Sequence, residues 1–153
     1  MDKIQVYTDG SCNNRTNDCG AFAVVLIYKE HIKEYSFGAY KQTTSARMEL
    51  RAIIHGLRMI KNKNILVELF GDNQYTINAI AKGWIYKWEK EGWYNRTNSD
   101  LLRELLFEYR QFPDGNVKFN WCKGHSGILY NERCDELAGI AAKSENIIDC
   151  RIK

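Results

Sequence analysis

The feature that most constrains the fold is a change in hydrophobic period close to residue 44. Before this point, apolar residues alternate with polar ones or form short β-branched runs, which is typical of strands. These runs cover residues 3–8, 21–28 and 32–40. After it, apolar residues recur at the spacing of an amphipathic helix; they are Met48, Leu50, Ile53, Ile54, Leu57 and Ile60. The pattern predicts a three-stranded antiparallel meander followed by a helix over 44–61.

The rest of the chain alternates helix patterns with strand patterns. The expected elements are strands at 64–70 and 116–121 and helices at 73–90 (interrupted near Gly83), 99–111 and 130–143. This order predicts an α/β fold with a mixed five-stranded sheet, in which two parallel strands join three antiparallel ones and helices flank the sheet. No repeat or linker divides the 153 residues, so we expect one domain over 1–153.

Composition excludes several classes of protein. The formal net charge is +3, which permits a nucleic-acid partner held by a local patch but does not require one. No apolar run approaches the roughly 20 residues of a membrane helix, and a strand pattern begins directly after Met1, so we expect neither a membrane span nor a signal peptide. The five cysteines lack a C-x-x-C pair, which argues against a disulfide framework or a zinc site and favours a reducing, cytoplasmic location.

Four carboxylates stand at unusual places in this pattern. Asp9 follows the first expected strand and Asp72 follows the fourth. Because ligands bind at the carboxyl ends of parallel strands, we expect these two residues to lie side by side at such an edge. Glu49 and Asp135 border the apolar faces of the first and last helices, where a carboxylate is costly unless it is paired or binds a metal.

Each carboxylate alone has an ordinary explanation as a turn residue, a helix cap or a surface charge. Four of them at one end of a sheet repel one another and therefore require cations. Oxygen ligands alone suit Mg²⁺ or Mn²⁺. Two such ions about 4 Å apart can clamp the attacking water and the leaving oxygen of a phosphodiester. The sequence therefore predicts a metal-dependent site for phosphodiester chemistry.

Five short motifs occur in the order and spacing of one known family. They are YTDGSC, ARMELRAI, GDNQYTINAI, WCKGHSG and NERCDELA. On these motifs the chain resembles type 1 ribonuclease H over essentially its whole length. The resemblance implies a ribonuclease H-like fold and endonucleolytic hydrolysis of the RNA strand of RNA–DNA hybrids, leaving 5′-phosphate and 3′-hydroxyl ends. It further implies two Mg²⁺ ions, with Mn²⁺ able to substitute, and a monomer without an obligatory protein partner.

The resemblance also assigns roles to individual residues. The family's metal-binding, catalytic carboxylates correspond to Asp9, Glu49, Asp72 and Asp135. The glycine-flanked His125 matches a histidine on a mobile loop that assists proton transfer or product release. Asn131 matches an asparagine that contacts the RNA strand near the scissile bond.

Positions that grip the substrate follow from the same resemblance. The residues expected to sense RNA in the minor groove are Cys12, Asn13, Ser45 and Gln74. Thr44 and Asn98 match a pocket for a phosphate of the DNA strand, and Thr44 is also expected to cap the first helix. Trp84 and Trp88 lie within residues 82–97, which resemble the basic handle that binds the DNA strand in this family. The two tryptophans are expected either to contact that strand or to form a small aromatic core that supports the handle.

Two departures from the family pattern concern substrate affinity. Glu89 and Glu91 stand beside the four basic residues of the handle, so its net charge is only +2. We therefore expect weaker hybrid binding with a shallower salt dependence. Ala46 lacks a side-chain donor at the minor-groove position. Neither departure affects the four carboxylates.

Three other interpretations remain open. Related nucleases that act on DNA carry similar carboxylates, although the KGHSG motif and the handle argue against that class. A hybrid-binding module without activity is a second alternative, against which the complete set of four carboxylates counts. The domain could also be fused to a reverse transcriptase, although the start at Met1 and the complete handle favour a free-standing protein.

Overall fold

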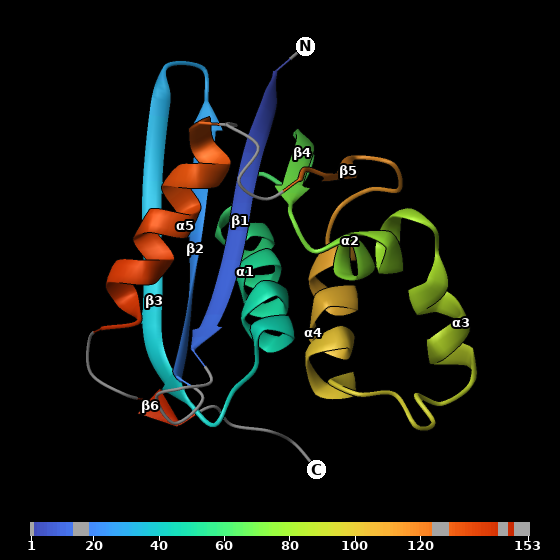
Figure 1. Ribbon diagram of the computed structural model, residues 1–153. Helices are drawn as coiled ribbons and strands as arrows, with labels where there is room; N and C mark the ends of the chain where they lie inside the picture. The colour runs from blue at the N-terminus through green and yellow to red at the C-terminus, as the bar shows by residue number, and fades with distance from the viewer. Residues whose placement is uncertain (1, 14–18, 124–128, 144–146, 149–153) are drawn as a thin grey trace.

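The computed structural model describes residues 2–13, 19–123, 129–143 and 147–148. The strands are β1 (Lys3–Asn13), β2 (Cys19–Tyr28), β3 (His31–Lys41), β4 (Leu66–Gly71), β5 (Val117–Trp121) and β6 (Ile147–Ile148). The helices are α1 (Ser45–Met59), α2 (Gln74–Ala81), α3 (Trp84–Lys90), α4 (Ser99–Tyr109) and α5 (Leu129–Ala141), as Figure 1 shows.

The six described strands form one sheet in the order β5-β4-β1-β2-β3-β6. β1, β2 and β3 pair antiparallel, whereas β4 runs parallel to β1 and β5 parallel to β4. This confirms the expected mixed sheet of three antiparallel and two parallel strands. The chain adds β6, a two-residue strand parallel to β3 that the sequence did not predict because so short a segment has no measurable period.

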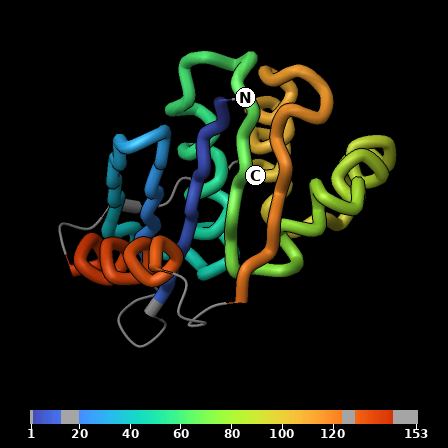
Figure 2. The backbone as a smooth tube through the Cα atoms, turned by 90° about the horizontal axis from the view of Figure 1, so that it is seen from above, coloured from blue at the N-terminus to red at the C-terminus, as the bar shows by residue number. Residues whose placement is uncertain are grey.

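Helices cover both faces of the sheet. α5 lies across β1, β2 and β3 on one face, whereas α1 and α4 pack on the other (Figures 1 and 2). α2 and α3 follow β4, and α3 lies farthest from the sheet (Figure 2). Within the described residues, no helix has the length and apolarity needed to cross a bilayer.

The main core lies between the sheet and the helices α1 and α4. The side chains of Val6, Ile54, Leu57, Leu69 and Leu105 are at most 1% exposed there. Burying each of them contributes roughly 1.5–3 kcal/mol. A smaller apolar cluster lies on the other face, where α5 packs on β1 and β2. The helical period that predicted α1 thus reflects a helix face buried against the sheet.

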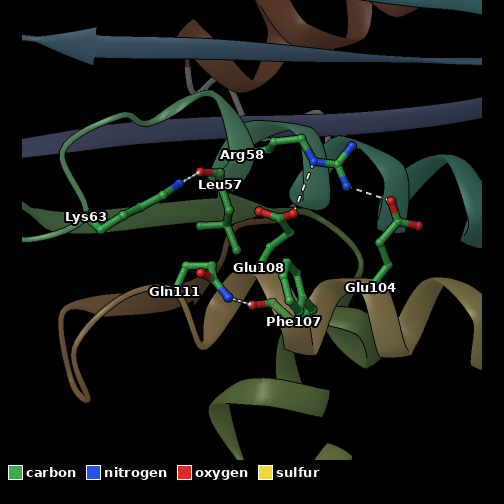
Figure 3. Close-up of polar contacts among 7 residues, drawn as sticks. All are labelled: Leu57, Arg58, Lys63, Glu104, Phe107, Glu108 and Gln111. Carbon is green, nitrogen blue, oxygen red and sulfur yellow. Dashed lines mark hydrogen bonds and ion pairs between the residues drawn. The ribbon is translucent and has the colours of Figure 1, made fainter.

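Ion pairs line the outer edge of the contact between α1 and α4 (Figure 3). Arg58 of α1 donates from Nε to Glu108 at 3.2 Å and from Nη2 to Glu104 at 2.6 Å, and both acceptors lie on α4. Beyond the end of α1, the Lys63 ammonium donates to the Leu57 carbonyl at 3.0 Å. Partly exposed pairs of this kind contribute at most about 1 kcal/mol each, so the apolar core supplies most of the attraction between the helices.

The first hairpin differs from expectation. Residues 11–20 carry Asn, Ser and Gly and are typical of a turn by sequence, but both described ends of this segment, 11–13 and 19–20, lie in strands. β1 continues to Asn13 and β2 begins at Cys19, with Ser11 paired to Ala21. Polar side chains concealed the strand, because the backbone hydrogen bonds of an antiparallel pair do not depend on side-chain polarity. As a result, Asp9 lies inside β1 instead of following it.

The expected interruption of the helical segment after β4 is confirmed. α2 ends at Ala81 and α3 begins at Trp84. Gly83 between them has a φ of +75°, a conformation that residues with side chains rarely adopt. The turn at Gly83 directs α3 away from the sheet, so the handle projects from the side of the molecule (Figure 2).

Candidate active site

Three carboxylates from separate elements converge at one end of the sheet. Asp9 lies in β1, Glu49 in α1 and Asp72 directly after β4, and one oxygen of each lies within 4.8 Å of the other two. The parallel pairing of β1 with β4 reaches Tyr7 and Phe70. Two residues farther along, the same register brings Asp9 beside Asp72, as expected for neighbouring parallel strands.

Glu49 joins this pair because α1 crosses β1 at very short distance. A Cβ atom at Gly10 would lie 2.4 Å from the Glu49 nitrogen and 2.4 Å from the Met48 carbonyl carbon. Only a residue without a side chain allows this approach. Glu49 is consequently 7% exposed and lies beside Asp9 instead of on the helix surface.

Burial and crowding favour protonated carboxyls at this site. The pKa of Asp9 is raised to about 8, first by burial and then by the charges of Asp72 and Asp135. The pKa of Glu49 is raised well above its ordinary value by burial, and next by the charges of Asp9 and Asp72. The N–H of Gly10 donates to Asp9 Oδ1 at 2.9 Å, which opposes the shift without cancelling it. A cation bound among these oxygens would remove their mutual repulsion.

Asp135 approaches the same place from the other face of the sheet. It is half-buried on α5 and close enough that its charge raises the pKa of Asp9, although it lies outside the group of three oxygens described above. Its neighbour Cys134 anchors α5 on β1, because the Cys134 thiol donates to the Tyr7 carbonyl at 3.2 Å. Carboxylates from α1 on one face and α5 on the other thus meet at Asp9.

The chemistry of this donor set fits a hard divalent cation. The three clustered residues offer carboxylate oxygens alone, which suit Mg²⁺ or Mn²⁺ better than they suit zinc. Since metal ligands must be deprotonated, a cation here competes with the protons that burial favours. Asp9, Glu49 and Asp72, with Asp135 adjacent, are therefore the residues that could hold such a cation.

Two residues at the end of β5 support Asp72, and sequence reasoning missed their role. The indole N–H of Trp121 donates to the Asp72 carbonyl at 3.0 Å. The N–H of Cys122 donates to the Gly71 carbonyl at 2.8 Å. Burial raises the pKa of the Cys122 thiol to about 11, so it stays protonated and donates to Asn131 Oδ1 at 3.6 Å. Trp121 ends the strand that runs parallel to β4, and this position beside Asp72 was the signal that could have identified its role.

The residues expected to face RNA lie around the ends of several elements. Ser45 and Gln74 are exposed and are the first residues of α1 and α2. Cys12 is half-buried near the end of β1. Asn131 lies on α5 and is 3% exposed, so most of its surface is covered by the protein.

Of the expected site residues, the structure describes one only through its backbone and leaves another outside the described residues. Asn13 ends β1, but its side chain lies outside the described part of the chain. His125 also lies outside the described residues, so its role stays a prediction.

The two residues of the expected phosphate pocket both contact Arg47. Thr44 is the N-cap of α1, and its Oγ1 accepts from the Arg47 backbone N–H at 3.2 Å. Asn98 directly precedes α4, and its Oδ1 accepts from Arg47 Nη1 at 3.3 Å. Thr44 is exposed and Asn98 is half-buried. The fold therefore brings two residues far apart in sequence within reach of one arginine that sequence reasoning did not identify.

Aromatic side chains from α2 and α3 form the surface of the handle. Of the two tryptophans expected to contact substrate, Trp84 is 37% exposed, whereas Trp88 is 7% exposed and belongs to the main core. Tyr75 of α2 stacks on Trp88 with ring centroids 5.7 Å apart, and the Arg96 guanidinium lies 4.3 Å from the centre of the Trp88 ring. Trp88 thus supports the surface from inside. Tyr75 was missed because it belongs to a different helix.

Glu89 takes part in an ion pair that the sequence did not indicate. Both of its oxygens accept from Arg110 at the end of α4, each at 2.7 Å. This hydrogen bonding lowers the pKa of Glu89. Counting Arg110 with the handle raises the net charge of that region from +2 to +3. The exposed acid that still offsets the basic residues is Glu91.

Comparisons with known proteins agree with this architecture. The RNase H family model matches residues 1–143. A ribonuclease H of Desulforamulus reducens is 45% identical over 149 residues, covering 96% of this chain and 92% of that protein. The crystal structure of LC9-RNase H1, a type 1 RNase H with the type 2 active-site motif, is 28% identical with a TM-score of 0.76, covering 93% of this chain and 72% of that chain.

A third comparison concerns LC11-RNase H1, which was solved in complex with an RNA/DNA hybrid. It is 20% identical with a TM-score of 0.64, and the match covers 91% of this chain and 96% of that chain. At this identity the likeness shows a common fold. The family model spans nearly the whole chain, and the relative from D. reducens matches over nearly its full length. This chain therefore belongs to the ribonuclease H family.

Proposed function

We propose that this chain hydrolyses the RNA strand of RNA–DNA hybrids endonucleolytically and leaves 5′-phosphate and 3′-hydroxyl ends. The observation that carries the proposal is the group formed by Asp9, Glu49 and Asp72, whose oxygens lie within 4.8 Å of one another. Membership of the ribonuclease H family supports it, as does the RNA/DNA hybrid bound by the similarly folded LC11-RNase H1.

The proposed cofactor is a pair of Mg²⁺ ions, for which Mn²⁺ can substitute. Asp9, Glu49, Asp72 and Asp135 would hold them, with Asp9 central because it lies next to each of the other three. When bound, the ions supply a water activated at neutral pH and a positive charge near the leaving 3′ oxygen. The N–H of Gly10 orients the Asp9 carboxylate, and Trp121 holds the backbone of Asp72.

Other residues of the chain would position the hybrid. The residues that face the RNA strand in this proposal are Cys12, Asn13, Ser45, Gln74 and Asn131. Thr44 and Asn98 bind a phosphate of the DNA strand. On the handle, Trp84 contacts the DNA strand and the buried Trp88 supports it. His125 assists proton transfer or product release.

The proposal also covers the form in which the protein acts. We expect a single domain over residues 1–153, in which residues 82–97 are the handle, that works as a cytoplasmic monomer without an obligatory protein partner. The continuous sheet that joins the first strands to β4 and β5 supports this expectation.

The test is cleavage of a hybrid whose two strands carry different labels, with Mg²⁺ or Mn²⁺ present. Wild type is compared with Asp72→Asn, which keeps the side-chain size but removes a charge from the clustered carboxylates. Asp114→Asn is the matched control, because Asp114 is exposed in the turn before β5 and lies outside the site. We expect wild type and the control to cut only the RNA strand, in a metal-dependent manner, and Asp72→Asn to lose at least about a hundredfold in rate.

Other results would contradict the proposal in distinguishable ways. Cleavage of the DNA strand would indicate a related nuclease with a different substrate. A hybrid that is bound but not cut by wild type would indicate a binding module whose carboxylates serve another purpose. Equal activity of Asp72→Asn and wild type would show that the clustered carboxylates do not carry the reaction.

A further inference from the structure

Arg47 is the largest fully buried side chain of the protein among the described residues. Its guanidinium meets the Asp100 carboxylate in a two-fold contact, with Nη1–Oδ1 at 2.9 Å and Nη2–Oδ2 at 2.8 Å. The side chains of Arg47 and Asp100 are 2% and 10% exposed, respectively. Such a buried pair is not an efficient way to gain stability, because desolvation offsets most of the attraction. The pair therefore calls for an explanation other than helix attraction alone.

A third contact of Arg47 determines how Asn98 is oriented. Nη1 of Arg47 also approaches Asn98 Oδ1 at 3.3 Å. An arginine has donors only, so the oxygen of the Asn98 amide must face it and the NH₂ group must point away. Asn98 has a φ of +62° and makes no capping hydrogen bond to α4, so its side chain is not occupied by its own helix. A side-chain amide with two free rotations is thereby fixed as an outward donor.

Arg47 also contacts Thr44, the other residue of the expected phosphate pocket. The backbone N–H of Arg47 donates to Thr44 Oγ1, which leaves the Thr44 hydroxyl hydrogen able to rotate toward a ligand. Arg47 thus contacts Thr44 through its backbone and Asn98 through its guanidinium. It connects the start of α1 with the start of α4.

We propose that Arg47 is a positioning residue that joins Thr44 and Asn98 into one donor pair for a phosphate of the DNA strand. It presents the Asn98 NH₂ group, not the amide oxygen, to the anion. Asp100 holds the guanidinium in the required plane. This inference rests on the proposed function, because the phosphate belongs to the hybrid that the chain binds.

If Arg47 served only to hold α1 against α4, changes at other residues of this helix contact would affect substrate binding equally. α1 and α4 are already held together by their apolar faces and by the pairs of Arg58 with Glu104 and Glu108 (Figure 3). Arg58 lies three helical turns beyond Arg47, roughly 16 Å along α1, and its partners Glu104 and Glu108 lie about one and two turns beyond Asp100 on α4. If Arg47 only docks the helices, then a change at Arg58 should disturb substrate binding in the same way.

The experiment measures KM and kcat for hybrids in which one DNA phosphate at a time is replaced by an uncharged methylphosphonate. The variants are Arg47→Lys, which keeps the charge but loses the planar fork, and Asn98→Asp, which keeps an oxygen toward Arg47 but replaces the outward donor by an acceptor. Arg58→Lys is the matched control, since it changes an arginine of the same helix pair. Thermal denaturation of each variant monitors folding.

With wild type, we expect one methylphosphonate position to raise KM about tenfold, the size of one hydrogen bond to a charged group, with kcat changed less than about twofold. This penalty should persist in Arg58→Lys. In Arg47→Lys and Asn98→Asp, KM for the unmodified hybrid should rise by a similar factor, and the position-specific penalty should disappear because the contact is already lost. If Arg47→Lys does not fold, Asp100→Glu, which shifts the guanidinium while keeping the pair, should show the same loss.

Two results would overturn the inference. One is that the methylphosphonate at the position found with wild type still raises KM about tenfold in Arg47→Lys or in Asp100→Glu. The other is an equal loss of the penalty in Arg58→Lys, which would reduce Arg47 to a helix contact. Absence of hybrid cleavage by wild type would instead contradict the proposed function itself.

Discussion

The backbones of Gly10 and Glu49 lie so close together that a methyl group at position 10 would stand 2.4 Å from the Glu49 nitrogen. This approach brings the carboxylate of α1 to the carboxylate of β1. The distance is far below any normal contact, so the geometry of the site depends on the absence of a side chain at one position.

Replacing Gly10 by alanine should therefore damage both stability and the metal site. The added methyl group would push α1 away from β1, which we expect to cost about 2–3 kcal/mol of unfolding free energy. The change should also separate Glu49 from Asp9 and weaken Mg²⁺ binding. Urea denaturation and calorimetric titration with Mg²⁺ measure the two effects. Gly139→Ala is the control, because a Cβ atom there meets nothing within 4 Å and should stabilise α5 by up to about 1 kcal/mol.

The raised pKa of Asp9 predicts how the stability of the metal-free protein depends on pH. The folded protein binds the Asp9 proton more tightly than the unfolded chain does, because the pKa rises from an ordinary value of 3.8 to about 8 on folding. The stability contributed by this group is therefore complete at low pH and is lost as the pH rises through about 8. Glu49 shifts in the same direction.

The variant Asp9→Asn lacks the titrating carboxyl, so comparing it with wild type measures the pH dependence of stability that Asp9 causes. In EDTA, the variant and wild type should have similar denaturation midpoints near pH 4, and the variant should become more stable by about 1 kcal/mol or more near pH 8. Saturating Mg²⁺ should restore wild type at pH 8 and have little effect on the variant. A difference between the two proteins that is constant from pH 4 to pH 8 would contradict the assignment.

Trp121→Phe tests whether the hydrogen bond to the Asp72 carbonyl matters for the site. Phenylalanine keeps an aromatic ring but loses the indole N–H that donates at 3.0 Å. One neutral hydrogen bond contributes about 1 kcal/mol, so we expect Mg²⁺ affinity to fall about fivefold. Calorimetric titration with Mg²⁺ checks this. Trp93→Phe, in the handle region, removes an indole elsewhere and should leave Mg²⁺ affinity unchanged.

Glu91→Gln tests the electrostatics of the handle. Glu91 is exposed, whereas the charge of Glu89 is balanced by Arg110, so removing Glu91 should strengthen attraction for the hybrid. We expect KM to fall about twofold at low salt and the difference to vanish near 1 M salt, where charges are screened within roughly 3 Å. Glu30→Gln, in the turn between β2 and β3, is a control of equal charge change. An equal decrease in KM for both variants would indicate a general effect of net charge.

Much of the fold follows from local pattern. The alternating runs before residue 44 and the helical spacing after it reflect which face of each element is buried, so β2, β3 and α1 were predictable from periods of two and 3.6 residues. The order of the elements predicted the mixed sheet. Because β1 and β4 are parallel, that prediction already placed Asp9 beside Asp72.

Other features depend on contacts between residues far apart in the chain. The polar composition of residues 11–20 concealed the extension of β1 and β2, since backbone pairing is blind to side-chain polarity. The sequence left open whether Trp88 contacts substrate or belongs to a small aromatic core, and the structure buries it under Tyr75 and Arg96, which come from outside its own helix. Glu89 is paired with Arg110 of a different helix, a contact that no local pattern indicates.

The sequence by itself determined the type and order of most elements and the identity of the acidic residues, because both are set by local chemistry and hydrophobic period. The tertiary structure alone decided how closely α1 approaches β1 at Gly10, which raises the pKa of the carboxylates that meet there. It also decided that Arg47 is buried between Asp100 and Asn98. The physical reason is that burial, repulsion and hydrogen-bond direction depend on distances between elements, which no local pattern encodes.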